Sequence, residues 1–236
     1  MPDIFYSGDR GSGKTTALVL RFCALLDQGV APQEIQVLSG QHYRSVQHFK
    51  SLLFQHHGRG LWGLRIHTHR HLARQVFEYA PPDTGSDRVL SLNPSDLILL
   101  LQQHYQAHRE QFFPGHQPTP GFFEHLLRRH QRCAQQLLWG EDLKQRSQRL
   151  ELDPIALQAN LFLADFSQAL QQQNPALIDP LAQAQHLHTQ VQRPEVQQHF
   201  AAAYWLVDNL EDTRPLDQHI FEQLSHSHTQ RICTWN

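Results

Sequence analysis

Residues 8 to 15 form an octapeptide with glycine at its first and sixth positions and lysine and threonine at its end. A short apolar run, Ile4-Phe5-Tyr6, precedes it, and Thr16 to Leu26 repeats apolar side chains at helical spacing after it. These patterns predict a strand, a glycine-rich turn and a helix in direct succession, which is the start of a parallel α/β layer. The octapeptide is Gly8-Asp9-Arg10-Gly11-Ser12-Gly13-Lys14-Thr15.

The residue types of this turn fit a phosphate group. Glycines let backbone N–H groups wrap around a phosphate, and the positive end of the following helix attracts the anion. In a G-x-x-x-x-G-K-T pattern the Lys14 ammonium reaches the β and γ phosphates, and the Thr15 hydroxyl is a ligand of Mg²⁺. We therefore predict binding of ATP with Mg²⁺; the alternative is an ordinary turn in which lysine happens to follow glycine. The residues expected to contact the nucleotide are Gly8, Gly11, Ser12, Gly13, Lys14, Thr15 and Thr16.

The rest of the chain predicts an α/β domain that is interrupted by helices. Residues 35–38, 64–68, 204–207 and 231–234 have strand character, and residues 45–54 and 72–79 have helical spacing. From Pro81 to about Asn174 the periodicity is helical, with proline-marked breaks and no convincing strand. We predict an α/β domain made of residues 1–80 and 177–236, with an all-helical insertion at residues 81–176.

One of the later strands ends in a carboxylate. Four apolar residues, Tyr204 to Val207, precede Asp208, and this arrangement delivers a ligand to the metal ion of a bound triphosphate. The alternative is an aspartate that only starts a turn or caps a helix. The next residue usually carries the carboxylate that orients or deprotonates the attacking water, but here it is Asn209. An amide cannot hold a proton at neutral pH, so we expect weak hydrolysis, and Glu211 could substitute only with altered loop geometry.

The composition excludes several classes of protein. The 20 basic and 22 acidic residues give a formal net charge of −2, so any contact with nucleic acid must use a local surface. The three cysteines are far apart and odd in number, which fits neither a disulfide framework nor a CxxC metal site and favours a cytoplasmic location. The sequence contains no signal-peptide pattern and no run of about 18 apolar residues, so we expect neither secretion nor membrane insertion.

Several segments, in the same order, resemble the N-terminal half of the UvrD/Rep type of superfamily 1 DNA helicases. Residues 8–35 are similar to the first motif of the family and its run to the second strand, and residues 206–213 are similar to its V-D-E-x-Q-D-T motif. Residues 65–73 resemble a segment that binds single-stranded DNA, and residues 177–179 and 194–200 resemble the approach to the acidic motif. The resemblance implies a RecA-like P-loop NTPase domain whose helical insertion is an accessory subdomain that lies over DNA.

The chain departs from the family at positions that matter for hydrolysis and for DNA. The catalytic glutamate of the family falls on Asn209, and the glutamine that senses the γ-phosphate falls on Glu211. The family's first DNA segment falls on residues 38–41 and matches poorly, and the phenylalanine of the next one falls on His69. The adenine-reading glutamine has no counterpart before Ile4. A second RecA-like motor domain would have to come from the chain beyond residue 236 or from another subunit.

From these features we expect the ATP-binding half of a UvrD-like DNA helicase, with reduced hydrolysis and with single-stranded DNA as its partner. The alternative is a catalytically inactive nucleotide-binding switch or structural subunit of a helicase-nuclease complex in DNA repair. A P-loop kinase is a third hypothesis, but no acceptor site is recognisable. The resemblance places Ser39, Thr68, His69 and Arg70 along the path of the DNA.

His67, His69 and His71 alternate around the end of a predicted strand, which would place their imidazoles on one face. A metal site is one interpretation, but the segment overlies a DNA-contact segment and 18 histidines are spread along the chain, so we favour contact with DNA. Protonation below about pH 6.5 would then aid contact with phosphate, and His69 could stack on a base. A solvated basic face is the alternative.

Overall fold

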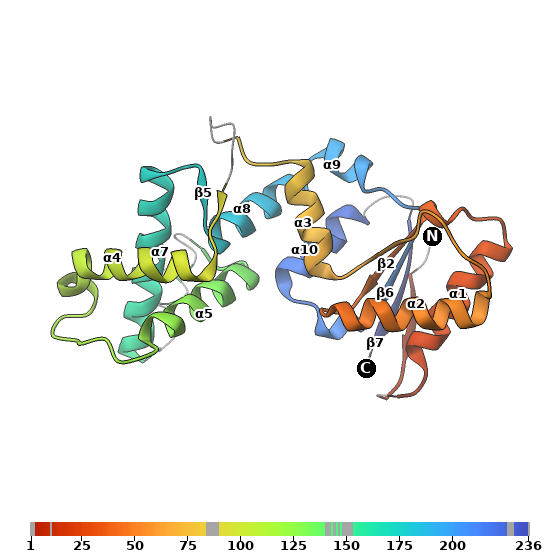
Figure 1. Ribbon diagram of the computed structural model, residues 1–236, viewed down its shortest axis with the longest axis horizontal. Helices are drawn as coiled ribbons and strands as arrows, with labels where there is room; N and C mark the ends of the chain where they lie inside the picture. The colour runs from red at the N-terminus through yellow and green to blue at the C-terminus, as the bar shows by residue number, and fades with distance from the viewer. Residues whose placement is uncertain are drawn as a thin grey trace. The chain divides into compact units, whose positions relative to one another are not determined.

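The computed structural model describes residues 3–9, 11–83, 90–139, 143, 145, 147, 153–225 and 229–235 (Figure 1). The chain divides into two compact units. The first contains Met1–Ala80 and Thr189–Asn236, and the second contains Pro81–His188. The second boundary therefore follows His188, whereas the sequence pattern placed it after residue 176.

The first unit is built on a five-stranded, all-parallel sheet in the order β1-β7-β6-β2-β3. Each strand agrees to within one residue at either end with a segment that the sequence predicted, so the prediction of an α/β domain with a parallel sheet is confirmed. The strands are β1 (Ile4–Ser7), β2 (Ile35–Ser39), β3 (Arg65–His67), β6 (Tyr204–Asp208) and β7 (Gln230–Trp235).

Helices cover both faces of this sheet (Figure 1). On one face, Phe22 of α1 and Phe49 of α2 are fully buried in a core that includes Leu206 of β6. On the other face, the neighbouring residue Trp205 is fully buried, and its ring contacts Phe221 of α10 at 5.7 Å. Successive strand residues point to opposite faces, so the apolar run at the end of β6 holds helices on both sides. The helices are α1 (Lys14–Asp27), α2 (Tyr43–His57), α3 (His69–Tyr79), α9 (Pro194–His199) and α10 (Pro215–Leu224), with 3₁₀ turns at Pro32–Glu34 and Leu210–Asp212.

The strand order gathers polar residues at the carboxyl ends of the strands. β6 and β7, which come late in the chain, lie between β1 and β2. In register, Ser39 at the end of β2 pairs with Asp208 at the end of β6. In parallel α/β sheets ligands bind beyond the carboxyl ends of the strands. The order of the strands therefore brings the glycine-rich turn, which follows the carboxyl end of β1, to the same end of the sheet as Asp208.

The second unit has an aromatic core between three helices, α4 (Pro94–Phe112), α5 (Phe122–Gln135) and α7 (Pro154–Gln173). It also contains most of α8 (Pro180–Gln190) and two short strands, β4 (Leu90–Ser91) and β5 (Leu177–Ile178), which pair in parallel. The sequence did not predict these strands, because two residues are too few to show an alternating pattern. Across the described ranges, no helix has the length and apolar character needed to cross a bilayer.

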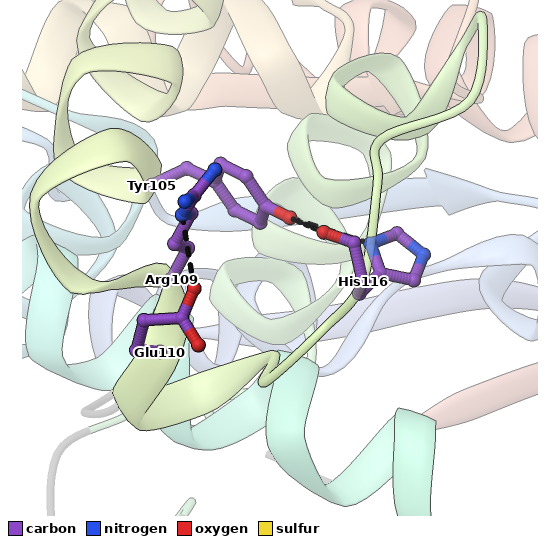
Figure 2. Close-up of polar contacts among 4 residues, drawn as sticks. All are labelled: Tyr105, Arg109, Glu110 and His116. Carbon is purple, nitrogen blue, oxygen red and sulfur yellow. Dashed lines mark hydrogen bonds and ion pairs between the residues drawn. The ribbon is translucent and has the colours of Figure 1, made fainter.

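Polar side chains fix the helices of this unit. The buried Tyr105 of α4 donates its hydroxyl to the carbonyl oxygen of His116 at 2.8 Å, which ties the loop after α4 to the helix (Figure 2). Asp179 belongs to the segment 177–179, which resembles the approach to the acidic motif of the helicases. In the structure its Oδ1 accepts from the N–H of Ala182 at 2.7 Å, at the start of α8. Its Oδ2 lies 3.1 Å from Nε2 of His130, and both side chains are fully buried.

The first prediction concerns the core of the second unit. The ring of Phe162 is fully buried and contacts Phe112 at 5.7 Å and Phe113 at 5.5 Å. Phe162→Ala should lower the free energy of unfolding by about 3–5 kcal/mol, because it leaves a cavity. Ile155→Ala, at a 63% exposed position in the same helix, should change it by less than about 0.5 kcal/mol. Urea unfolding and amide hydrogen exchange in α4 and α7 measure the free energy of unfolding of each variant. Equal losses of stability in Phe162→Ala and Ile155→Ala would contradict the packing described.

Candidate functional site

Gly8, Asp9 and residues 11–13 lie in the turn that leads from β1 into α1, and Lys14 and Thr15 are the first two residues of that helix. Gly11 and Gly13 have φ values of +81° and +86°, a region that costs a residue with a side chain about 1–2 kcal/mol. A Cβ atom at Gly8 would lie only 2.8 Å from the hydroxyl of Ser12. Gly13 is the N-cap of α1 and has no side chain to accept from the first backbone N–H groups, and the first turn of the helix contains no acidic residue. The positive end of the α1 dipole is therefore available to an anion.

The ammonium group of Lys14 lies inside this turn. Lys14 is buried, and its Nζ donates to the carbonyl oxygen of Gly8 and, at 2.9 Å, to that of Asp9. Both of these acceptors are neutral, so they hold the ammonium in the turn without cancelling its charge. Thr16, the third residue of α1, is half-buried. The turn thus combines backbone N–H groups with a positioned cation.

Asp208 lies beside the start of α1 and is 3% exposed. The Thr15 hydroxyl donates to its carboxylate at 3.0 Å and 3.2 Å, and the Thr234 hydroxyl of β7 donates to Oδ1 at 2.9 Å. Thr234 also accepts from the backbone N–H of Asn209 at 2.7 Å. Burial raises the pKa of Asp208, the hydrogen bonds from Thr234 and Thr15 oppose this, and the charge of Glu211 raises the pKa further. The sequence indicated Thr15 and Asp208 as candidate metal ligands but did not indicate Thr234. No motif marks Thr234, which is simply one residue of a predicted strand.

Glu211 adds a second carboxylate near Asp208. Within the described part of the chain, both of its carboxylate oxygens are shielded from solvent and have no hydrogen-bond partner. A buried carboxylate is costly unless a cation or hydrogen-bond donors compensate it. The oxygen atoms of Asp208, Glu211 and Thr15 are the donor type that Mg²⁺ prefers, so these residues fit a magnesium ion. Asn209, between the two carboxylates, has a left-handed backbone with φ +57°.

The four residues assigned to DNA differ in exposure. Ser39 is fully buried, and His69 is 2% exposed. Thr68 is half-buried, and its hydroxyl caps α3 by accepting from the N–H of His71 at 3.1 Å. Arg70 is exposed. The ring of His69 is therefore enclosed by the protein and not presented for stacking on a base, and Arg70 is the most exposed of the four.

The three alternating histidines do not share one face. The strand ends at His67 and α3 begins at His69, so the alternation stops there. The rings of His67 and His71 stack at 5.2 Å, whereas His69 is buried. Burial, with the nearby charges of His71, Arg65 and Lys50, lowers the pKa of His67 to about 4. The expectation that it is protonated just below pH 6.5 was therefore wrong, because a partly buried imidazole beside cations stays neutral.

A cavity of about 510 Å³ lies beside β3, at the opposite edge of the sheet from β1. Arg65, His67 and Glu78 give it a polar lining of mixed charge. The sequence did not predict it, because its walls come from four separate segments. The full lining consists of Gln36, Gly63, Leu64, Arg65, His67, Gln75, Glu78, His199 and Phe200.

No protein-family model matches this chain, and no curated protein matches it either. The functional inference therefore depends on two features of the first unit, the glycine-rich turn with Lys14 and the Asp208 cluster with Thr15 and Thr234.

The second prediction concerns the charge of Asp208. Its raised pKa means that folding favours the neutral acid, so this residue contributes stability below the ordinary aspartate pKa of about 4 and loses it as the pH rises through the folded value. Asp208→Asn should therefore raise the free energy of unfolding at pH 7, by about 0.5–2 kcal/mol, and have little effect near pH 4. Thermal melts at both pH values test this. Asp27→Asn, at an exposed site, is the control, and a lower stability of Asp208→Asn at pH 7 would contradict the prediction.

Proposed function

We propose that this chain is the ATP-binding half of a UvrD-like DNA helicase, with a RecA-like P-loop NTPase fold, that couples ATP to the binding of single-stranded DNA. The observation that carries the proposal is the hydrogen bond between Thr15 and Asp208. It joins the first turn of the helix after a glycine-rich turn to the carboxyl end of a parallel strand. A Mg²⁺ ion on a bound triphosphate needs these two side chains, one from each element.

Each part of the site has a role in this proposal. The backbone N–H groups of Gly11, Ser12 and Gly13 and the Lys14 ammonium bind the phosphates. Thr15 and Asp208 would hold Mg²⁺, which would supply positive charge to the bound triphosphate. The parallel sheet with helices on both faces supports a RecA-like class, and residues 81–176 correspond to the accessory subdomain. The partners are single-stranded DNA and a second RecA-like motor domain.

Hydrolysis requires a group that accepts a proton from the attacking water. Asn209 follows the metal ligand and has no basic side-chain atom, and its backbone N–H is bound to Thr234. Glu211 is a carboxylate, but its oxygens are shielded from solvent. The site therefore supports binding of ATP more strongly than turnover. For DNA, the exposure of Arg70 is compatible with contact to a phosphate of the backbone, and Thr68 fixes the start of its helix.

A second function is favoured by the same asparagine. A nucleotide-binding switch, or a structural subunit of a helicase-nuclease complex in DNA repair, needs the phosphate turn and Asp208 but no general base. Asn209, which cannot act as a general base, is compatible with such a role. The two hypotheses agree on ATP binding and differ only on turnover.

The third prediction tests ATP binding. Lys14→Ala should weaken the affinity for Mg²⁺-ATP by about 10- to 100-fold, because charge-assisted hydrogen bonds contribute about 1.5–3 kcal/mol. Titration with a fluorescent ATP analogue measures this. Lys50→Ala, which removes an exposed lysine from α2, should leave the affinity unchanged. Equal affinity of the wild type and Lys14→Ala would overturn the proposed function.

The fourth prediction separates the two functions. Asn209→Glu should raise the rate of phosphate release by about 10²- to 10⁴-fold, because it supplies a general base. Asn209→Gln is the matched control, since it has the same length and places the same demand on the left-handed backbone but cannot take a proton. Release by the wild type that rises with single-stranded DNA supports the helicase and excludes the switch. Release by Asn209→Glu alone supports the switch.

A further inference from the structure

The second unit contains a cluster of metal-binding side chains that the proposed function does not use. His104 and His108 lie four residues apart on α4, and Asp165 lies on α7. One ligand atom from each lies within 4.8 Å of the other two, and within the part of the chain that the structure describes this is the one such group. We propose that these three residues bind a divalent transition-metal ion of the Zn²⁺ class.

The backbone sets the spacing of the two histidines. Residues i and i+4 of a helix lie on the same face, one turn apart, and α4 continues without a break through both positions. Their rings lie 4.4 Å apart. The buried Tyr105, next to His104, fixes the rotation of the helix, because its hydroxyl donates to the carbonyl oxygen of His116 (Figure 2). Arg109, next to His108, is paired with Glu110 at 3.1 Å (Figure 2).

The third ligand comes from the neighbouring helix. Nε2 of His104 lies 2.9 Å from Oδ2 of Asp165. Two ligand atoms of a tetrahedral Zn²⁺ ion lie roughly 3.3 Å apart, so a small side-chain movement brings this pair to ligand spacing once the proton is lost. The rings of Phe162 and Phe166, which flank Asp165 on α7, lie 5.2 Å and 5.5 Å from the His104 ring. These rings give His104 a fixed, apolar wall. Asp165 is 41% exposed, so solvent reaches the open side of the cluster.

The donor set selects the kind of ion. Two imidazoles and one carboxylate suit Zn²⁺, Co²⁺ and Ni²⁺, whereas Mg²⁺ and Ca²⁺ prefer oxygen donors alone. Three protein ligands and a side open to solvent leave a position for water, which is the ligand count of open zinc sites. Since the ligands come from α4 and α7, a bound ion would cross-link the two helices of the aromatic core.

The fifth prediction is that the 236-residue chain binds one equivalent of Co²⁺, a spectroscopic probe for Zn²⁺, in the presence of excess Mg²⁺. The visible absorption of Co²⁺ should show the intense bands of a four- or five-coordinate site, and Zn²⁺ should displace it. Because loss of even an outer-shell partner costs about 10- to 100-fold in metal affinity, His108→Ala and Asp165→Asn should each weaken binding at least about tenfold.

The matched control is His71→Ala, which removes an imidazole from another pair of neighbouring histidine rings, His67 and His71. This variant and Asp208→Asn should keep the Co²⁺ affinity of the wild type, which separates the cluster from the proposed nucleotide site. Circular dichroism checks that each variant is folded. Wild-type spectra with only weak octahedral bands, or equal affinity in His108→Ala and the wild type, would overturn the proposal.

Discussion

The first unit depends on a hydrogen-bond cluster centred on a buried carboxylate. Asp208 accepts from Thr15 at the start of α1 and from Thr234 in β7, so it joins segments from both ends of the chain. This is possible only because β7 lies between β1 and β6 in the sheet. Burial nevertheless raises the pKa of Asp208, and Glu211 raises it further. Folding thus places two carboxylates where a cation would relieve their repulsion, and this is the physical basis for the proposal that a metal ion and a triphosphate bind at the carboxyl end of the sheet.

In the proposed function, nucleotide binding and turnover depend on different residues. The glycine-rich turn and Asp208 would bind the nucleotide, whereas proton transfer would fall to the position of Asn209. Its backbone is left-handed, and asparagine tolerates this region better than glutamate does. The geometry that turns the chain after β6 therefore favours the residue that cannot act as a base. A weak hydrolase and a nucleotide-dependent switch are both consistent with this site. In the hydrolase, a partner such as the second domain or DNA must make up for the missing general base, whereas the switch needs no general base.

Local sequence patterns predicted the main elements of the first unit, whereas contacts between distant residues could not be predicted from them. The five strands of the first unit and the glycine-rich turn follow from neighbouring residues, because apolar runs and glycines act over a few positions. Thr234 could not be assigned, since its partners, Asp208 and Asn209, are distant in the sequence. The burial of Ser39 and His69 and the low pKa of His67 likewise depend on packing that a single sequence does not show. The cluster on α4 and α7 was missed for the same reason, because Asp165 lies far from His104 along the chain.

The two proposed cation sites are chemically independent. The site at Asp208 offers oxygen atoms only and suits Mg²⁺, which holds water strongly and binds with the help of phosphate oxygens. The site at His104 offers imidazole nitrogens and suits an ion of the Zn²⁺ class without a nucleotide. Excess Mg²⁺ should therefore leave the second site available, and loss of either site should leave the other intact. Each compact unit then carries its own ion, one tied to the nucleotide and the other to the packing of α4 against α7.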